Sequence, residues 1–365
     1  MNMDFIEALS EIEREKGISK ELLIDAIEAA MISSYKRNFN TAQNVRVDIN
    51  RQTGLIRVYA RKTVTEDVLD PRLEISLHAA REINPNYQMD DIVEIEVTPR
   101  DFGRIAAQTA KQVVTQRIRE AERGLIYNAF IDKEEDIVTG ILQRQDQRNI
   151  YVDLGKVEAV LPLTELMPTD KFKHLDRIKA YITKVENTTK GPQIILSRTH
   201  PGLLKRLFEL EVPEIFDGVV EIRSVAREAG FRSKIAVHSR NPEVDPVGSC
   251  VGPKGLRVQT IVGELRGEKI DIVRWMESVE EYVANALSPS KVLEVQVHET
   301  EKMARVIVPD YQLSLAIGIK GQNARLAAKL TGWKIDIKSE SQAEQEYGRP
   351  KTFTEEMHQD SVSID

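Results

Sequence analysis

The feature that most constrains this chain is a repeat in its C-terminal half. The stretch VGSCVGPKGLRVQTIVGELRGEKIDI, residues 247–272, is echoed by LSLAIGIKGQNARLAAKLTGWKIDI, residues 313–337. Each copy contains an apolar run, a Gly-x-x-Gly, an amphipathic run and Lys-Ile-Asp-Ile. The first glycines of the two copies lie 66 residues apart, and the lysines of Lys-Ile-Asp-Ile lie 65 apart. The repeat therefore predicts two tandem domains of one fold.

Hydrophobic periodicity predicts the same order of elements in both copies: helix, two strands, helix, Gly-x-x-Gly, helix and strand. The first copy supplies 203–216, 219–226, 231–239 and then the repeated segment; the second supplies 279–287, 292–297, 305–309, 313–317, 322–330 and 334–338. This order resembles the prokaryotic form of the KH RNA-binding domain. We expect the two KH domains to occupy residues 201–277 and 278–344.

The two Gly-x-x-Gly loops carry the chemistry that we expect to contact RNA. Glycine allows the backbone to approach a sugar-phosphate chain closely, and the start of the following helix attracts an anion. A KH loop of this kind holds about four nucleotides of single strand, so two adjacent loops predict a longer site. The spacing of a phosphate-binding GxxxxGK[ST] loop is absent from both copies. The predicted RNA-binding residues are Gly252, Pro253, Lys254, Gly255, Arg257, Gly318, Ile319, Lys320, Gly321, Asn323 and Arg325.

Residues 133–200 contain five short strand-like runs with a polar, partly helical crossing at 163–176, which predicts a Greek-key OB barrel. The text Val152-Asp153-Leu154-Gly155 and Leu196-Ser197-Arg198-Thr199 resembles the OB barrel named after ribosomal protein S-one. Exposed aromatics are scarce in this segment, and Tyr151 and Tyr181 are the candidates to stack on a base. The sequence leaves open whether this barrel binds RNA strongly or mainly acts as a scaffold.

Residues 1–132 predict an α+β head followed by a connecting helix. Helical spacing in the first 31 residues predicts two helices, alternation over 45–58 predicts a β-hairpin, and 93–97 predicts a further strand. A long helical pattern runs from about 102 to 130. The predicted fold class is thus multidomain α+β: a head with a helical connector, an OB barrel and two tandem prokaryotic-type KH domains.

Composition limits the remaining functions. One cysteine, Cys250, excludes an internal disulfide, and it aligns with Ala316 of the second copy, which predicts a buried structural role. The six histidines and the carboxylates show no catalytic or metal-binding spacing, so we expect no enzyme activity, metal or cofactor. The N-terminus lacks the features of a secretory signal and no apolar run could span a membrane, which predicts a cytoplasmic protein.

The net charge of −7 is unevenly distributed. Residues 1–132 carry −4 and 339–365 carry −5, whereas 133–200 and 201–338 carry +1 each. Any attraction for phosphate must therefore come from local placement of Lys and Arg. The acidic segment 345–365 is poor in apolar residues, and we expect it to be a disordered tail.

The order of head, helical connector, S-one-type barrel and two Gly-x-x-Gly-containing KH domains resembles the NusA family of bacterial transcription elongation and termination factors. The resemblance covers about residues 1–340 and implies a monomeric adaptor without catalytic activity. Its implied partners are RNA polymerase, bound by the head, single-stranded nascent RNA, bound by the KH pair, and other elongation factors. The alternatives are a ribosome-associated or ribosomal-RNA-binding factor and an accessory protein of RNA decay.

Overall fold

The structure is a computed structural model that describes residues 3–39 and 44–347. Its contacts divide the chain into two compact units, which are described separately below. One unit comprises Met1–Asn128 with Thr189–Pro192, and the other comprises Ala129–Thr188 with Gln193–Asp365.

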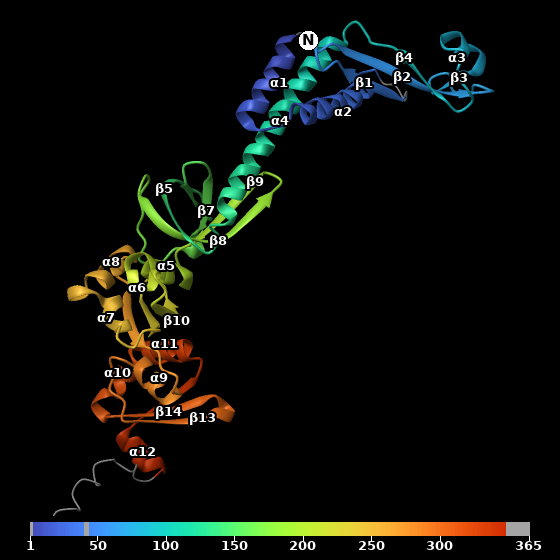
Figure 1. The fold of residues 1–365 in the computed structure, drawn as a ribbon. Coiled ribbons are helices and arrows are strands. Elements are labelled where there is room, and N and C mark those ends of the chain that lie inside the picture. The colour runs from blue at the N-terminus through green and yellow to red at the C-terminus, as the bar shows by residue number, and fades with distance from the viewer. Residues whose placement is uncertain (1–2, 40–43, 348–365) are drawn as a thin grey trace, which may run out of the picture. The chain divides into compact units, whose positions relative to one another are not determined.

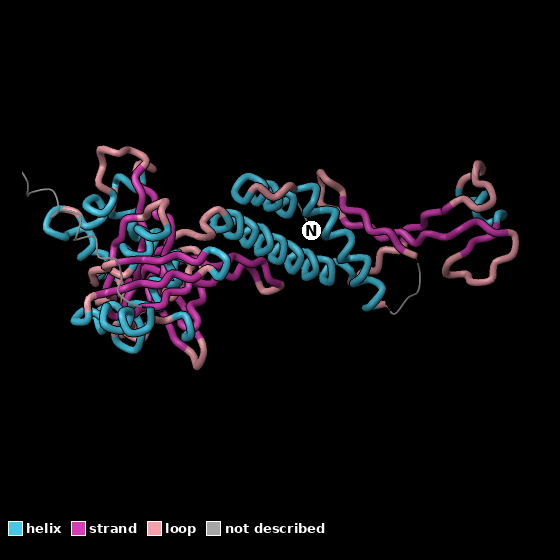
Figure 2. The backbone as a smooth tube through the Cα atoms, turned by 90° about the horizontal axis from the view of Figure 1, so that it is seen from below, coloured by secondary structure: helices cyan, strands magenta, loops and turns pink. Residues whose placement is uncertain are grey.

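The first unit contains the head, in which three helices pack against a sheet (Figures 1 and 2). Ile24, Met31, Val47 and Phe102 belong to one apolar core between helices and strands, while Val64 and Val93 belong to a second, smaller core. Strand β2 is shared by the pairings with β1, β3 and β4. The helices are α1 (Met3–Lys16), α2 (Lys20–Asn38), α3 (Leu77–Ile83) and α4 (Phe102–Ile131); the strands are β1 (Val45–Ile49), β2 (Ile56–Thr65), β3 (Glu74–Ser76) and β4 (Ile92–Glu96).

The five strands predicted in the next segment close into a barrel in the order β5-β6-β7-β9-β8. The single parallel pairing, β7 with β9, and the closure of β5 on β8 give the Greek-key OB arrangement. The predicted helical crossing is reduced to one 3₁₀ turn, η1 (Leu163–Glu165). The strands are β5 (Ile137–Gln145), β6 (Asn149–Asp153), β7 (Glu158–Pro162), β8 (Arg177–Thr188) and β9 (Gly191–Ser197).

The repeat forms two three-stranded sheets with the same connectivity, in which the first two strands are antiparallel and the last two parallel. The helix predicted at 203–216 is divided in two because Pro213 starts a new helix. The first copy contains α5 (Pro201–Glu211), α6 (Pro213–Phe216), β10 (Val220–Glu228), β11 (Arg232–Ser239), α7 (Pro246–Val251), η2 (Pro253–Gly255), α8 (Leu256–Glu264) and β12 (Lys269–Arg274).

The second copy ends in a helix that the sequence analysis missed. Ser339 accepts from the backbone N–H of Gln342, and the Gln342 side chain accepts from the N–H of Ser339, a reciprocal capping box that starts α12. The helix extends three residues into the segment predicted as a disordered tail, and 348–365 lie outside the described residues. The elements are α9 (Val279–Ala286), β13 (Glu294–His298), η3 (Glu299–Glu301), β14 (Met303–Val308), η4 (Asp310–Gln312), α10 (Leu313–Ile317), η5 (Ile319–Gly321), α11 (Gln322–Thr331), β15 (Lys334–Ser339) and α12 (Glu340–Tyr347).

The first KH sheet is covered on both faces. One face packs on its own helices, whereas Ala226, Ala236 and Val273 on the other face share a core with α9 and α11 of the second copy. Polar contacts reinforce this packing, since Ser224 Oγ and the Tyr282 hydroxyl both donate to the carbonyl of Leu330, at 2.8 and 3.0 Å. The two KH domains therefore share one interior.

The barrel meets the first KH domain through hydrogen bonds from two buried arginines, each of which is also ion-paired within its own domain. Arg198, 1% exposed, forms two hydrogen bonds with Asp170 at 2.8 and 3.0 Å and also donates to the carbonyl of Glu264. Arg227 binds Glu268 and donates to the carbonyl of His200. Because removing one partner would leave a buried charge unpaired, these contacts favour a single arrangement of barrel and KH domain.

Candidate nucleic-acid interface

The two Gly-x-x-Gly loops have the same backbone conformation. The first glycines, Gly252 and Gly318, have φ/ψ of 72°/173° and 76°/174°. The lysines at the third position, Lys254 and Lys320, are both left-handed, with φ 53° and ψ 24° or 29°. The last glycines have φ of 75° and 73°. Two segments of different sequence thus adopt one loop structure.

Glycine is required at the first position of each loop for steric reasons. A φ near +75° with ψ near 175° is accessible almost only to glycine. In the second loop, a Cβ on Gly318 would also lie 2.8 Å from the backbone nitrogen of Asn323. In the first loop, a Cβ on Gly252 would meet the flexible side chain of Arg257, at 2.7 Å.

The residue five positions after the first glycine fixes each loop to the preceding helix. Arg257 donates to the carbonyl of Ser249 at 2.6 Å and pairs with Glu214 at 3.0 Å. Asn323 is 2% exposed and donates to the carbonyls of Ala316 and Leu287, both at 3.0 Å. The amide nitrogen of Asn323 is therefore committed to holding the loop, so any contact with RNA by this residue would fall to its amide oxygen.

The exposed cations of the loops are Lys254 and Lys320, and within the described residues neither forms an ion pair. The inner residues Pro253 and Ile319 are exposed as well, Ile319 to 85%. Arg325 differs, because its guanidinium binds Glu228 at 2.7 Å and the carbonyl of Lys320 at 3.1 Å. Neither α8 nor α11 has a side chain capping its N-terminus, which leaves the positive end of each helix dipole open beside the loop.

The repeated Lys-Ile-Asp-Ile has a structural explanation. Its aspartate faces a cation on the neighbouring parallel strand: Asp271 is in register with Lys234, and Asp336 with Arg305. Lys234 is fully buried and donates to Asp271 at 2.9 Å. Burial would raise the pKa of Asp271, but hydrogen bonds from Arg232 and attraction by Lys234 outweigh it and lower the pKa. The motif therefore stabilises the sheet.

In each domain a cavity is lined by the helix that precedes the loop and by the last strand, and in the first domain α9 and the segment after it line the cavity as well. In the first domain, Val247 of α7 and Ile272 of β12 line a cavity of about 550 Å³. In the second, Leu313 and Ile317 of α10 and Ile337 of β15 line one of about 620 Å³. Polar side chains also line both cavities, so each combines apolar and polar walls in a volume of the size of a ligand pocket.

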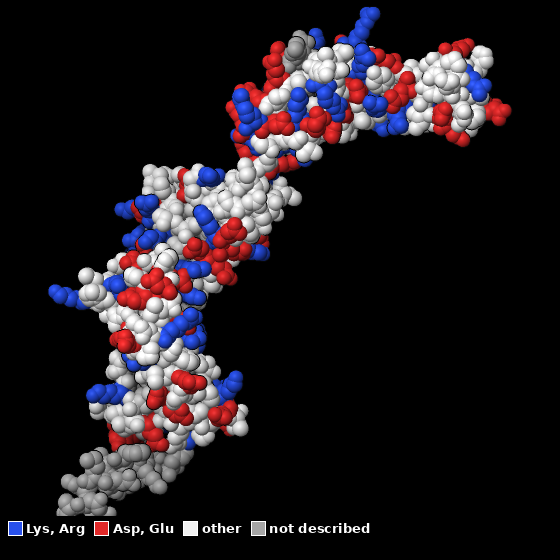
Figure 3. All heavy atoms as spheres, in the orientation of Figure 1, with Lys and Arg blue, Asp and Glu red and all other residues white. Residues whose placement is uncertain are grey.

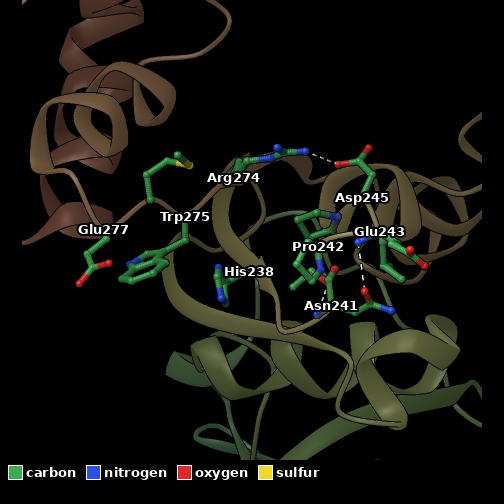
Figure 4. Close-up of a pocket in the computed structure, with 12 residues that line it drawn as sticks. His238, Asn241, Pro242, Glu243, Asp245, Arg274, Trp275 and Glu277 are labelled. Atoms are coloured by element: carbon green, nitrogen blue, oxygen red, sulfur yellow. Dashed lines mark hydrogen bonds and ion pairs between the residues drawn. The ribbon is translucent and has the colours of Figure 1, made fainter.

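A further cavity of about 390 Å³ lies where the loop after β11 meets the end of β12 (Figure 4). Figure 4 shows Arg274 reaching toward Asp245, at 2.7 Å, and His238 beside Trp275, with ring centroids 5.2 Å apart. Three carboxylates and one arginine line it, so its charge is unfavourable for phosphate. This cavity is therefore a poor candidate for an RNA contact.

The two tyrosines predicted as base-stacking candidates on the barrel have different surroundings. Tyr181 is 7% exposed and stacks on His200 at 4.7 Å, so the prediction that its ring could receive a base is wrong. Tyr151 is partly exposed, but its hydroxyl donates to Asp146 and the Arg144 guanidinium lies 3.5 Å from its ring centre. Sequence could not reveal either contact because both partners come from other elements.

Other chemistry is limited. Cys250 is fully buried, as predicted, and burial raises the pKa of its thiol to about 12. Among the described residues, no group of three or more His, Cys, Asp or Glu is placed to hold a metal ion. None of the helices in the described ranges combines the length and apolar character that a bilayer span requires.

Comparison with known proteins agrees with the domain order. Family models match residues 4–124 as a NusA N-terminal domain, 131–198 as an S1 RNA binding domain, 198–275 as a NusA-like first KH domain and 279–345 as a NusA-like second KH domain. The transcription termination/antitermination protein NusA of Halalkalibacterium halodurans is 76% identical over 345 residues, which are 94% of this chain and 90% of that protein. The chain belongs to the NusA family.

NusA proteins of other bacteria give the same result. The Bacillus subtilis protein is 71% identical over 343 residues, covering 94% of this chain and 92% of its own length. The Thermus thermophilus protein is 42% identical over 346 residues, covering 92% of this chain and 89% of its own. The NusA resemblance and the predicted fold class are therefore confirmed.

Proposed function

We propose that this chain is an RNA-binding transcription factor that acts on RNA polymerase to modulate pausing, termination and antitermination. The relatives that match over more than nine-tenths of the chain are named as transcription termination/antitermination proteins. The observation that carries the RNA-binding part is the pair of loops with the same backbone conformation, each followed by a helix without a side-chain cap and preceded by a helix that lines a cavity.

In this proposal, each loop holds the backbone of single-stranded RNA. Lys254 and Lys320 attract phosphate oxygens, while the glycines allow the RNA to approach the protein backbone. The cavities lined by the helices that precede the loops accept the bases. Because the two KH domains share an interior, the loops are held at a fixed separation, so binding at one raises the effective concentration of the same RNA at the other.

The head supplies the polymerase contact in this proposal. It has a core of its own and carries −4 over residues 1–132, which suits a basic protein surface. The proposed domain limits lie at residues 132, 200, 277 and 344, and the last of them falls within α12. Factor and polymerase together would stabilise one path of the nascent transcript over another without making or breaking a covalent bond.

The RNA part is tested by placing aspartate in the loops of the full chain. The paired changes Pro253→Asp with Lys254→Asp, or Ile319→Asp with Lys320→Asp, keep the glycines and bring negative charge to the phosphate site. Each pair should weaken binding of single-stranded RNA by about 1 to 3 kcal/mol, and all four changes together should weaken it further. Circular dichroism and thermal melting check the fold. A folded quadruple variant with the parent's RNA affinity would refute the RNA-clamp proposal.

The polymerase part is tested with residues 1–132, which should retain purified RNA polymerase on a column without RNA. The quadruple loop variant of the full chain should bind polymerase as the parent does. If the protein instead co-purifies with ribosomes and residues 1–132 do not retain polymerase, the ribosome-associated alternative is favoured. Degradation of labelled RNA with phosphate and magnesium would favour the RNA-decay alternative.

A further inference from the structure

A fourth cavity lies at the junction of the two KH domains. Its volume is about 710 Å³. The first domain contributes the turn between β10 and β11 and the residues before β12, and the second contributes its Gly-x-x-Gly loop and the start of α11. The cavity therefore exists only in the assembled pair.

The aromatic ring of Phe231 is exposed to solvent at this junction. Phe231 lines the cavity and is 58% exposed, although an aromatic side chain is costly to leave in water. Leu315 and Ile319, 47% and 85% exposed, line the same cavity from the second domain. An exposed ring with neighbouring apolar side chains is the surface on which single-stranded nucleic acids stack their bases.

The charges around this ring favour a polyanion. Four cations, Arg232, Lys269, Lys320 and Arg325, and one carboxylate, Glu228, line the cavity, a net charge of +3. Arg232 and Arg325 are held by ion pairs with Asp271 and Glu228. Lys269 and Lys320 are exposed and, within the described part of the chain, form no ion pair. They are available to phosphates on either side of a stacked base.

The cavity also contains a buried polar atom without a partner. Asn323 lines it, and although the amide nitrogen makes two hydrogen bonds, the oxygen Oδ1 is buried and accepts none from the residues that the structure describes. Such an acceptor usually has a partner in a folded protein. An exocyclic base amine or a ribose 2′-hydroxyl would provide the missing donor.

We propose that the junction cavity is a nucleotide site between the two clamps, in which one base of a single RNA strand stacks on Phe231. Lys269 and Lys320 contact the flanking phosphates, and Asn323 Oδ1 accepts a hydrogen bond from the nucleotide. This inference rests on the proposed RNA binding, which it extends from two separate clamps to a continuous strand. The net positive charge favours RNA over an acidic or neutral apolar peptide as the occupant.

The test compares two exposed phenylalanines of the full chain. Phe231→Ala removes the proposed stacking ring, and Phe216→Ala is the matched control, because Phe216 is 79% exposed at the end of α6 and does not line the cavity. The probe is fluorescein-labelled single-stranded RNA of random sequence, about 12 nucleotides long, enough to reach both clamps. Phe231→Ala should weaken the binding of this RNA about 5- to 20-fold, which is at the low end of the range expected for the loss of one stacked base. Phe216→Ala should leave the binding of this RNA unchanged.

Two further measurements identify the mode of binding. An RNA of about 4 nucleotides fills a single clamp and should lose less affinity from Phe231→Ala than the longer RNA does. A Phe231→Trp variant should retain the affinity for the longer RNA, and its added fluorescence should be quenched by that RNA. A Phe216→Trp variant should show no such quenching.

The outcomes separate this inference from the proposed function. If the loop aspartate variants lose RNA but Phe231→Ala binds as the parent does, the junction site is wrong and the clamps stand. If neither set of variants changes RNA binding, both proposals are wrong. If Phe231→Ala keeps its RNA affinity but loses polymerase in the pull-down, the cavity belongs to a protein contact and the nucleotide site is refuted.

Discussion

At the scale of single residues, different side chains perform the same function at equivalent positions of the repeat. Arg257 and Asn323 both connect the Gly-x-x-Gly loop to a carbonyl of the preceding helix. Only the long arginine also reaches Glu214, whereas the short amide is enclosed. The glycines cannot be exchanged in this way, because the first one occupies a conformation that other residues avoid.

The two glycines of the second loop should therefore differ in their tolerance of alanine. Gly318→Ala combines an unfavourable φ/ψ with a Cβ 2.8 Å from a backbone atom, whereas at Gly321 a Cβ would meet nothing within 4 Å. We expect Gly318→Ala to lower the unfolding free energy of the KH pair by about 2 to 4 kcal/mol and Gly321→Ala by about 1. Urea unfolding measures both; equal losses would show that the backbone contact is unimportant.

The buried pair of Lys234 and Asp271 should make the KH pair sensitive to acid. Hydrogen bonds and attraction from Arg232 and Lys234 overcome burial and hold the pKa of Asp271 below its usual 3.8. The stabilisation is therefore complete above about pH 4 and is lost as the pH falls through the lower, folded pKa. In thermal melts, the parent should exceed Asp271→Asn in stability at pH 6, and the difference should shrink toward pH 2. If the parent and Asp271→Asn differed in melting temperature by the same amount at pH 6 and pH 2, the ion pair would not be the source of the acid sensitivity.

At the scale of elements, the residues on the outer face of each KH sheet suit the segment that lies next to that face. Ala226 and Val273 on the first sheet are small and apolar beneath α11. The strand registers place Gln296 and Lys338 at the equivalent positions of the second sheet, where α12 follows instead of another KH domain. Polar residues at these positions do not favour the packing of a further domain on this sheet, as in the terminal unit of a tandem array.

Glutamate should therefore destabilise the fold at one of these equivalent positions and have little effect at the other. Ala226→Glu buries a charge where the residue is 3% exposed, and it should lower the unfolding free energy of the KH pair by about 2 to 4 kcal/mol. Gln296→Glu changes an exposed position and should alter it by less than about 0.5 kcal/mol. Chemical denaturation of the two full-length variants measures this. If Ala226→Glu lowered the unfolding free energy only slightly, the two KH domains would not share an interior.

At the scale of the whole molecule, charge is arranged locally. Figure 3 shows basic and acidic side chains intermixed on the visible surface, and the KH region carries only +1. Much of the basic charge is neutralised internally, since Arg198, Arg227 and Lys234 are paired and buried. RNA binding must therefore depend on a small number of exposed cations near the loops and the junction.

This distribution predicts a shallow salt dependence. If two to five phosphates are neutralised, the logarithm of the RNA association constant should fall against the logarithm of salt concentration with a slope of roughly −1.4 to −3.5. Fluorescence titrations of the full chain between low and moderate salt give this slope. A slope near −8 would reveal a phosphate-tracking surface outside the loops.

Much of the fold could be predicted because its signals are local. Periodicity located the long helix α4, the β1–β2 hairpin and the helix at Leu313–Ile317, and the two Gly-x-x-Gly sequences located both loops. The helix α12 was missed because its polar sequence resembles a disordered tail, although the capping pair Ser339 and Gln342 was a usable signal.

The repeat, the loop conformation and the family follow from the amino-acid sequence, because glycine placement, alternation and capping act over a few residues. Which polar residues remain available for RNA depends on tertiary packing. Tyr181 and Arg325 are committed to partners up to 97 residues away, and the amide nitrogen of Asn323 is committed to holding its loop. Only folding brings Phe231 of one domain beside Lys320 of the other. Side-chain availability depends on packing between distant segments, which sequence periodicity does not encode.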